Sequence, residues 1–382
     1  MTQNREVRWV RLGDFIEQID ERNKDNSFTL DDLRGLSIQK KFISTKANMD
    51  GVSLTAYKLV PPKSFCYVTI TSRNSEKITL ALNETAETFI VSSSYIVFKC
   101  IQDKKLLPEY LFLWYYMAEF DRYARFNSWG SARESFSWLS MQLVKIPVPY
   151  KDGEPDVDRQ QEIVDVWQGL RRLKEENEAL AKPLLELCDA KMDELKHSAP
   201  MVELGKYIIE RKEINSDGCY SENDARGVNT EKEIQPCKRI GENLSSYKVV
   251  YPNDFVYNAN IKLTKTTEKL AIALFNEQKK CIVTNFYTVF SCNSDFIPEF
   301  LFLWFIRDEF ARYVKFMSCS SVRDRFDFNQ MAYIKVPKPS LEVQKAIVDI
   351  YHCARRAKEI AAQADKKLKE ICPALMQHII HS

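Results

Sequence analysis

Two long stretches of the chain place apolar residues at alternating steps of three and four. The first stretch begins at Ile163 and ends at Leu187, and the second begins at Ile347 and ends at Leu375. This heptad spacing predicts two long helices, each with a coiled-coil seam. The predicted seam positions include Ile163, Val166, Leu170, Leu173, Asn177, Leu180, Leu184 and Leu187 in the first helix, and Ile347, Ala354, Ala361 and Leu368 in the second.

The two predicted seams complement each other in size. The first is rich in leucine and the second in alanine, so the helices could approach closely if they paired. Asn177 occupies a seam position where a polar residue fixes the register at some cost in stability. Pro183 predicts a kink in the first helix. We expect the helices to pack on each other; the alternative is that each packs only on its own globular half.

The stretches that precede the two helices repeat each other. Residues 107–126 and 297–316 are identical at eleven of twenty positions, at an offset of 190. Other features recur in the same order: Leu-Gly at 12 and 204, Ser-x-Arg ending at 133 and 323, Pro-x-Pro at 147 and 337, and a Gln before Ile-Val-Asp at 160 and 344. A unit of about 190 residues is too long for a solenoid repeat and indicates a duplicated domain.

Each half combines short β-rich runs with helices, which predicts a mixed α/β (α+β) fold. The runs are Phe65–Ile70, Ile78–Leu82 and Phe89–Lys99, then Phe255–Asn258, Leu270–Phe275 and Cys281–Ser291. A short helix should begin at Pro108 and at Pro298, and each Pro-x-Pro should end regular structure. We expect globular domains at 1–155 and 200–340, and long helices at 156–199 and 341–382.

Composition narrows the class of protein. The net charge of +2 neither favours nor excludes a nucleic-acid partner, because a local basic stripe is sufficient. Ten scattered cysteines without a C-x-x-C pair, and four histidines, argue against a zinc site. The opening residues lack an apolar signal region, and the apolar stretches are too short for a bilayer, so we expect a cytoplasmic chain with reduced thiols and no membrane partner.

The motifs of two enzyme classes, adenine-N6 methyltransferases and phosphate-loop motors, are missing from the sequence. Its single Pro-Pro pair lies between Val60 and Lys63, without the Asn/Asp and Tyr/Phe flanks of an adenine-N6 methyltransferase. There is no G-x-x-x-x-G-K-[ST] phosphate loop, and no glycine-rich loop that would hold a cofactor. The sequence therefore predicts a chain without catalytic residues or cofactors.

The duplicated order of Leu-Gly, aromatic helix, Ser-x-Arg, Pro-x-Pro, Gln and long helix resembles the specificity subunits of type I restriction–modification systems. The resemblance implies two target-recognition domains, each binding one half of a bipartite, asymmetric site in double-stranded DNA. It implies antiparallel spacer helices that dock two DNA adenine methyltransferase subunits, with restriction/translocase subunits completing the complex. The chain departs from its own pattern where Gly130 becomes Ser320, and where residues 150–158 lack a counterpart.

Basic and amide side chains in loops that leave β-runs are the candidates for DNA contact, because these groups bind phosphates and base edges. They are Lys40, Lys41, Arg73, Asn74 and Arg133 in the first half, and Asn260, Lys262, Lys265 and Arg323 in the second. Solvated turns are the alternative for the loops, and ion pairs with Glu134 or Asp324 for the two Ser-x-Arg arginines. The aromatic residues Trp114, Tyr115, Trp304 and Phe305 are expected in the core.

Three other functions remain open at this point, and one of them is a stand-alone enzyme, which methyl transfer from S-adenosylmethionine by the purified chain would reveal. The chain could be an accessory specificity subunit of a phage-defence methylase that has no nuclease. It could also be a scaffold that binds proteins through its coiled coil and does not bind DNA.

Overall fold

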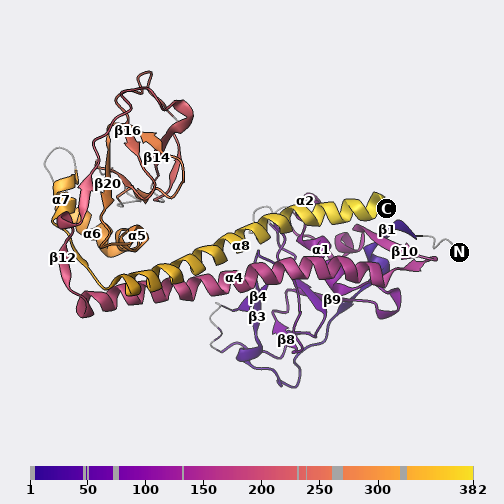
Figure 1. Cartoon of the computed structure of the whole chain (residues 1–382). Coiled ribbons are helices and arrows are strands. Elements are labelled where there is room, and N and C mark those ends of the chain that lie inside the picture. The colour runs from indigo at the N-terminus through magenta and orange to yellow at the C-terminus, as the bar shows by residue number, and fades with distance from the viewer. Residues whose placement is uncertain are drawn as a thin grey trace. The chain divides into compact units, whose positions relative to one another are not determined.

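The computed structural model describes residues 5–45, 49, 51–71, 77–130, 133–229, 232–237, 239–259, 270–318 and 325–381, with residues 371–381 described by their backbone alone. The chain forms two compact units. Unit 1 contains residues 1–176 and 360–382, and unit 2 contains residues 177–359. Both units mix helices and strands, as predicted (Figure 1).

The main sheet of unit 1 has four antiparallel strands in the order β2-β9-β6-β7. A three-stranded sheet, β1-β10-β11, and the pairs β3-β4 and β5-β8 complete its strands. The strands are β1 (Arg5–Arg11), β2 (Ile16–Ile19), β3 (Arg34–Leu36), β4 (Phe42–Ser44), β5 (Lys58–Val60), β6 (Ser64–Tyr67), β7 (Leu80–Leu82), β8 (Phe89–Val91), β9 (Ile96–Cys100), β10 (Lys145–Lys151) and β11 (Glu154–Pro155). The short helices are α1 (Pro108–Tyr116), α2 (Ala118–Phe126) and α3 (Trp138–Gln142).

Unit 2 repeats this plan. Its sheet β13-β20-β17-β18 corresponds strand for strand to the main sheet of unit 1, and β15-β14-β19-β16 forms a second sheet. Its strands are β12 (Met201–Glu203), β13 (Ile208–Glu210), β14 (Ala225–Val228), β15 (Ile234–Pro236), β16 (Lys248–Val250), β17 (Phe255–Asn258), β18 (Ile272–Leu274), β19 (Cys281–Val283), β20 (Tyr287–Cys292) and β21 (Lys335–Pro337). Its short helices are α5 (Pro298–Phe305), α6 (Asp308–Met317) and α7 (Phe328–Ala332).

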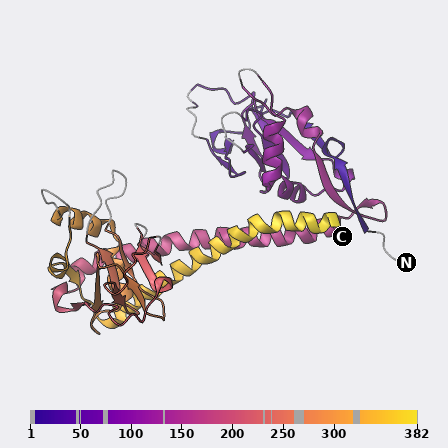
Figure 2. The same cartoon turned by 90° about the horizontal axis from the view of Figure 1, so that it is seen from above.

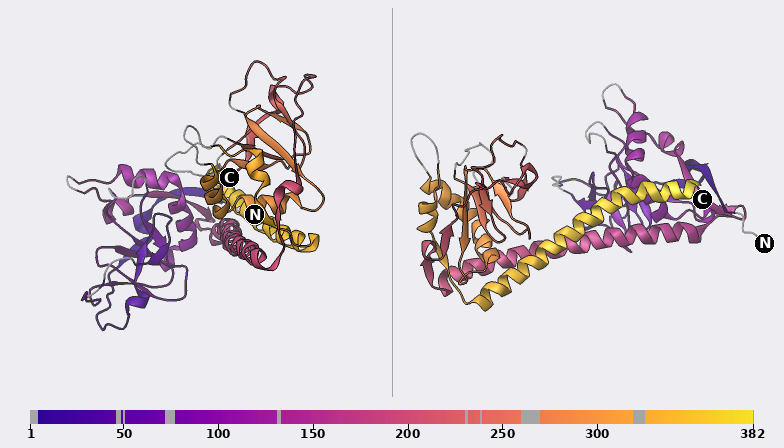
Figure 3. Two further views of the ribbon diagram at one scale, coloured as in Figure 1. Left: turned by 90° about the vertical axis from the view of Figure 1, so that its left-hand side faces the viewer. Right: turned by 45° about the horizontal axis from the view of Figure 1, so that its top comes forward.

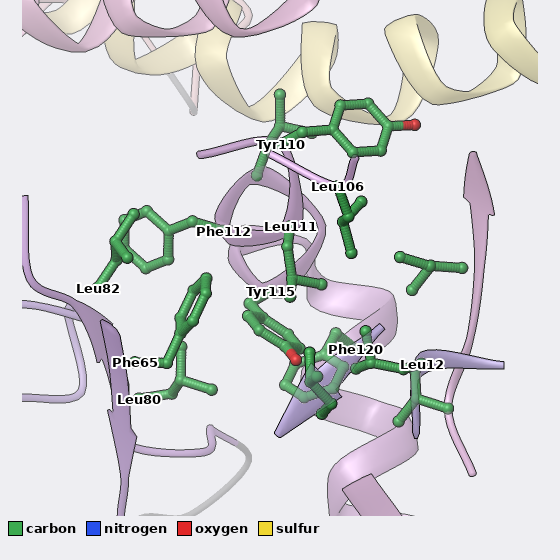
Figure 4. Packing of buried hydrophobic residues seen from close by; sticks show 14 of the residues in the cluster. Leu12, Phe65, Leu80, Leu82, Leu106, Tyr110, Leu111, Phe112, Tyr115 and Phe120 are labelled. Atoms are coloured by element: carbon green, nitrogen blue, oxygen red, sulfur yellow. The ribbon is translucent and has the colours of Figure 1, made fainter. Parts of the chain in front are cut away.

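The two cores are built from matching aromatic pairs. Phe65 stacks on Phe98 with ring centroids 4.9 Å apart, and Phe255 stacks on Phe290 at 4.8 Å. Figure 4 shows Phe65 and Tyr115 meeting between the sheet and α1, where their rings lie edge to face at 5.5 Å. Tyr115 is fully buried, so this part of the aromatic helix is core, as predicted.

The repeated glutamine fastens each long helix to the start of the aromatic helix. Gln160 accepts a hydrogen bond from the backbone N–H of Leu107 at 2.9 Å and donates to the carbonyl of Lys105 at 3.0 Å. Gln344 accepts from the N–H of Ile297 at 2.9 Å and donates to the carbonyl of Asp295 at 3.0 Å. Both glutamines are fully buried, which explains why this residue type recurs with the helix.

The Leu-Gly repeat has a packing explanation. A Cβ atom added to Gly13 would lie 2.9 Å from the Cβ of Gln142, and one added to Gly205 would lie 2.8 Å from the Cβ of Ala332. The preceding Leu12 donates its N–H to the carbonyl of Val144 at 2.8 Å. Only glycine permits this close approach to the short helix that precedes β10 or β21.

Each unit contains a segment of both long helices, α4 (Val157–Ser198) and α8 (Leu341–His381), in agreement with the predicted helices (Figures 1 and 2). In unit 1, Lys174 of α4 pairs with Asp365 of α8 at 2.6 Å. In unit 2, Met192 of α4 shares a core with Ile347 of α8. In unit 1 the N-terminal part of α4 packs against the C-terminal part of α8, and in unit 2 the C-terminal part of α4 packs against the N-terminal part of α8. The two helices therefore pair antiparallel (Figure 3).

The predicted seam is correct for α8. Ile347, Ala354, Ala361 and Leu368 are all buried. In α4, Ile163 is buried, and Leu170, Asn177 and Leu184 are half-buried.

The intervening seam positions of α4 were predicted wrongly. Val166, Leu173, Leu180 and Leu187 are 45%, 43%, 52% and 42% exposed. The adjacent positions, Trp167, Ala181 and Cys188, are buried instead. At these positions burial falls on the following residue and not on the predicted one. The predicted residues therefore form a stripe of exposed apolar side chains at seven-residue intervals.

Two local predictions also need correction. The runs 89–99 and 281–291 each form two strands, because a turn such as Ser92 to Tyr95 interrupts them. The first Pro-x-Pro lies inside β10, where the carbonyls of Pro147 and Pro149 accept from Tyr110 and Asp156 on the side away from β1. Helix α4 includes Pro183 within one continuous element, and the kink expected there stays a prediction.

Candidate nucleic-acid interface

Two loops that the sequence singled out meet in unit 1. The N–H of Phe136, just beyond the Ser-x-Arg segment, donates to the carbonyl of Thr69 at 2.8 Å. The N–H of Thr71 donates to the carbonyl of Glu134 at 3.0 Å. The segment that follows α2 is therefore fixed to the segment that follows β6.

Unit 2 repeats this junction. The N–H of Phe326 donates to the carbonyl of Ala259 at 2.8 Å, and both residues lie 190 positions after their counterparts in unit 1. The geometry thus joins the same two segments in both units. The predicted residues Arg73, Asn74, Asn260, Lys262, Lys265 and Arg323 adjoin these junctions in sequence and lie outside the described residues.

A narrow hairpin presents Arg133 in unit 1. Trp129 and Ser135 exchange two backbone hydrogen bonds, at 3.0 and 3.2 Å. Gly130 has a φ of +148°, and a Cβ atom there would lie 2.2 Å from the carbonyl oxygen of Arg133. The hairpin therefore requires glycine at this position, which accounts for the Gly-Ser-x-Arg pattern of the first half.

Arg133 is exposed at the end of this hairpin. The alternative for this residue was an ion pair with Glu134, but Glu134 pairs with Arg125 of α2 instead. Among the described residues, no acidic group pairs with Arg133. Its guanidinium group is therefore available to a phosphate or a base edge, and DNA contact stays a prediction for it.

Lys40 does not lie where DNA contact would require it. Its side chain is 5% exposed and its Nζ donates to Asp121 of α2 at 2.6 Å. Burial lowers the pKa of Lys40, and the Asp121 carboxylate opposes that shift. The predicted contact of Lys40 with DNA is thus contradicted by its burial: the residue anchors the β3-β4 turn to the helical layer.

Unit 2 contains the equivalent anchor with a different partner. Lys40 and Lys232 both have a left-handed backbone, with φ of 59° and 65°, in matching hairpin turns. Lys232 donates from Nζ to the carbonyl of Phe305, at the end of α5, at 2.9 Å. A lysine near the last carbonyls of a helix satisfies an acceptor that has no partner within the helix.

Lys41 is exposed but faces the long helix. Its Nζ lies 2.6 Å from a carboxylate oxygen of Glu175 on α4. Burial opposes ionisation of Glu175, but the hydrogen bond from Lys41 and the charge of Arg171 lower its pKa overall. Arg171 also binds Glu84 through two hydrogen bonds of 2.9 Å. These ion pairs fasten the globular part of unit 1 to α4.

Sequence reasoning missed a group of exposed aromatic residues near the Arg133 hairpin. Trp129 is 70% exposed and Phe126, the last residue of α2, is 77% exposed. Phe316 occupies the position of Phe126 in unit 2 and is 79% exposed. Position in the repeat was the available signal, since the two phenylalanines end the most similar stretch of the two halves.

The described part of the chain lacks both a metal-binding cluster and a membrane-spanning helix. No group of three or more histidine, cysteine, aspartate or glutamate side chains there could hold a metal ion. No helix there combines the length and the apolar composition needed to cross a membrane.

Residues 203–370 match a sequence family described as the type I restriction modification DNA specificity domain. The S subunit of a type I restriction-modification system from M. genitalium has a similar fold, with a TM-score of 0.53 at 12% identity, over 99% of this chain and 96% of that chain. The HsdS subunit from Thermoanaerobacter tengcongensis aligns over 98% of this chain and 96% of its own, with 16% identity and a TM-score of 0.39. No curated protein matches the chain.

Proposed function

We propose that this chain binds a bipartite DNA site and directs partner enzymes to it. The matching domain and the similar fold confirm its resemblance to type I specificity subunits. Each unit would bind one half-site through the loops that meet beside its main sheet. The observation that carries this proposal is the repeated junction, Phe136 to Thr69 in unit 1 and Phe326 to Ala259 in unit 2. Two copies of one binding device suit a site with two halves.

The residues proposed for DNA contact are those near this junction. Arg133 is exposed there, and Arg73, Asn74, Asn260, Lys262, Lys265 and Arg323 adjoin it in sequence. Basic groups beside amides and hydroxyls suit a surface that must bind phosphates and distinguish base edges. Different loop sequences in the two units suit two different half-sites, hence an asymmetric target.

We propose that the methyltransferase partners dock along α4. The exposed stripe of Val166, Leu173, Leu180 and Leu187 has the seven-residue spacing that another helix would bury. Because the units are duplicated, we expect two methyltransferase subunits, with restriction/translocase subunits joining the larger complex. The chain itself would supply target choice and no chemistry.

Exchange of the variable part of unit 2 tests the two-site proposal. A chimera that keeps both long helices but carries residues 207–333 of a different specificity subunit should change one half of the methylated sequence. Long-read methylome sequencing of cells that carry the chimera and its methyltransferase provides the measurement. A change in both halves, or no adenine methylation at a split site with the natural chain, would contradict the proposal.

Substitution on the stripe tests docking. The double variant Leu173→Ser, Leu180→Ser should no longer co-purify with the methyltransferase, because two polar groups would enter an apolar contact. Lys182→Ser is the control, since the Lys182 side chain is 82% exposed and lies off the stripe. Retained assembly by the double variant would show that partners bind elsewhere. A chain that recruits proteins through this stripe without binding DNA would favour the scaffold alternative.

A further inference from the structure

Trp129 lies on the surface although two aromatic residues near it in sequence are core. It is 70% exposed, whereas Phe120 and Phe136, on either side of it in sequence, are 1% and 0% exposed. Single exposed apolar residues are common on proteins and need no explanation. Trp129, however, follows a second exposed aromatic residue, Phe126, by three positions, at the candidate interface.

The backbone around Trp129 is fixed by several independent contacts. Trp129 and Ser135 pair across the hairpin, and Ser135 also bridges to Ile70 in the segment after β6. Glu134 pairs with Arg125 of α2. A side chain presented from such a support loses little conformational freedom when a ligand binds it.

The charges beside Trp129 favour a polyanion. Arg125 of α2 pairs with Glu134 of the hairpin, so these two charges balance. Arg133 adds a positive charge for which the described residues offer no acidic partner. An apolar ring with a free cation beside it is the arrangement by which proteins insert a wedge into DNA while holding its phosphates.

We infer that Trp129 stacks on a base of the half-site that unit 1 binds, and so partly unstacks one base step. This inference rests on the proposed function and extends it from contact to deformation. The position that matches Trp129 in the second half is Cys319, which has no ring to stack. Phe126 and Phe316 are exposed in both units, so apolar contact is shared, but the wedge belongs to unit 1.

A wedge gives unit 1 a second source of specificity. The cost of unstacking depends on the base step, and pyrimidine–purine steps deform most easily. Unit 1 would therefore discriminate at a step whose base edges it does not contact. Unit 2 would depend more on direct contacts, so the two half-sites would be recognised by different physical means.

The test uses the full chain in complex with the methyltransferase subunits that co-purify with it. The DNA duplexes carry the target sequence that methylome sequencing identifies. In each set, 2-aminopurine replaces the base at one position, and this position is moved step by step through each half-site. The fluorescence of 2-aminopurine should rise at one step of the unit 1 half-site and at no step of the other. Trp129→Ala should abolish the rise and weaken binding about 5- to 150-fold, the usual effect of removing one stacked base. Trp129→Phe should retain part of both.

Trp9→Ala is the matched control. Trp9 is also an exposed tryptophan of unit 1, at 51%, but it lies on β1 and packs edge to face on Trp114. This variant should leave the fluorescence pattern and the affinity for DNA unchanged.

Four results would overturn the inference, and a fifth would overturn the proposed function on which it rests. Trp129→Ala with unchanged fluorescence and affinity would assign the residue to ordinary surface. Loss of the methyltransferase from this variant would make the hairpin a protein contact, and equal losses with Trp9→Ala would show a general effect of removing exposed rings. Specific binding by the natural chain without any rise in fluorescence would reject the wedge but leave the proposed function intact. The absence of specific binding would reject the proposed function itself.

Discussion

The interiors of the two units are nearly copies, but their charged contacts are not. The stacked phenylalanine pairs, the buried glutamines and the close-packed glycines recur at matching positions. Unit 1, however, fastens its globular part to α4 through Lys41 and Arg171. Unit 2 does so through Arg307 and Lys196, which pair with Asp193 and Glu309.

This difference separates what the fold requires from what each copy has acquired. Packing positions tolerate little change because an interior is close-packed and a lost atom leaves a cavity. Charged contacts at the surface contribute little individually, so they can be exchanged without loss of the fold. The anchor lysines fall between these cases, since Lys40 and Lys232 hold the same turn through different acceptors.

Removal of the anchor lysines should show the largest difference between the units. Lys40→Met leaves the Asp121 carboxylate buried without its cation, and should lower the stability of unit 1 by about 3 kcal/mol. Lys232→Met leaves one backbone carbonyl unpaired, and should lower the stability of unit 2 by about 1 kcal/mol. Hydrogen exchange measured by mass spectrometry reports on each unit separately. Equal effects, or an effect of Lys41→Met as large as that of Lys40→Met, would refute this distinction.

Substitution of the buried glutamines should affect both units alike. Gln160→Leu leaves a backbone N–H and one carbonyl without their partner, and Gln344→Leu leaves a backbone N–H and two carbonyls, those of Asp295 and Pro339. Each should cost its own unit roughly 2 kcal/mol. The control is Gln161→Leu, because Gln161 is exposed and bonds only to Asp165 on its own helix. Urea dependence of hydrogen exchange provides the measurement. Destabilisation of one unit alone would show that the two glutamines contribute different free energies although their hydrogen bonds match.

Reversal of a surface charge should have a smaller effect, confined to unit 1. Lys41→Glu places a carboxylate against Glu175 and should destabilise the contact with α4 by about 1 kcal/mol or less, since both side chains are nearly half exposed. Addition of Glu175→Lys should restore it, and the cost should shrink in high salt. Limited proteolysis of the β3-β4 turn gives the readout. A double variant that remains as sensitive as the single one would exclude this ion pair as the cause.

Acid should weaken unit 2 slightly through Asp193. Hydrogen bonds from Lys196 and Arg307 lower the pKa of Asp193 from 3.8 to about 2. A depressed pKa contributes stability that is present above the ordinary value, so it is lost as the pH falls from about 4 to about 2. The effect should be small because solvent screens this exposed carboxylate. Thermal unfolding of Asp193→Asn should show a shallower acid dependence than the natural chain, and Asp189→Asn should show no such change.

The repeats and the heptad spacing were enough to predict the class of fold and both long helices. The seam of α8 was correct because alanines leave no other apolar face on that helix. The seam of α4 was half wrong because Leu173 and Leu180 look like core positions, whereas burial falls on Trp167 and Ala181. An apolar stripe that binds a partner has the same spacing as one that binds its own chain, so the pattern alone could not separate the two.

Single residues of the candidate interface were harder to predict. Lys40 looked like any basic loop residue, because its partner Asp121 lies 81 positions away in the sequence. Trp129 did not stand out in the sequence, because an aromatic residue near a helix has the same pattern whether it is exposed, as Trp129 is, or core, as Phe120 is. The exposure of Trp129 depends on the backbone of its hairpin, and Gly130 is the only residue whose type indicates that hairpin in the sequence.

The division of α8 between the units sets an order for biosynthesis. Unit 2 consists of one continuous segment, so it can fold as soon as residue 359 has left the ribosome. Unit 1 has to wait for residues 360–382, although its other residues are made first. At about 5–20 residues per second, the nascent N-terminal part spends roughly 10–40 seconds without Leu368, the α8 residue that belongs to its core. The first half of this chain is therefore the part most in need of a chaperone, and a transcript cut short would yield a folded second unit attached to an unfinished first one.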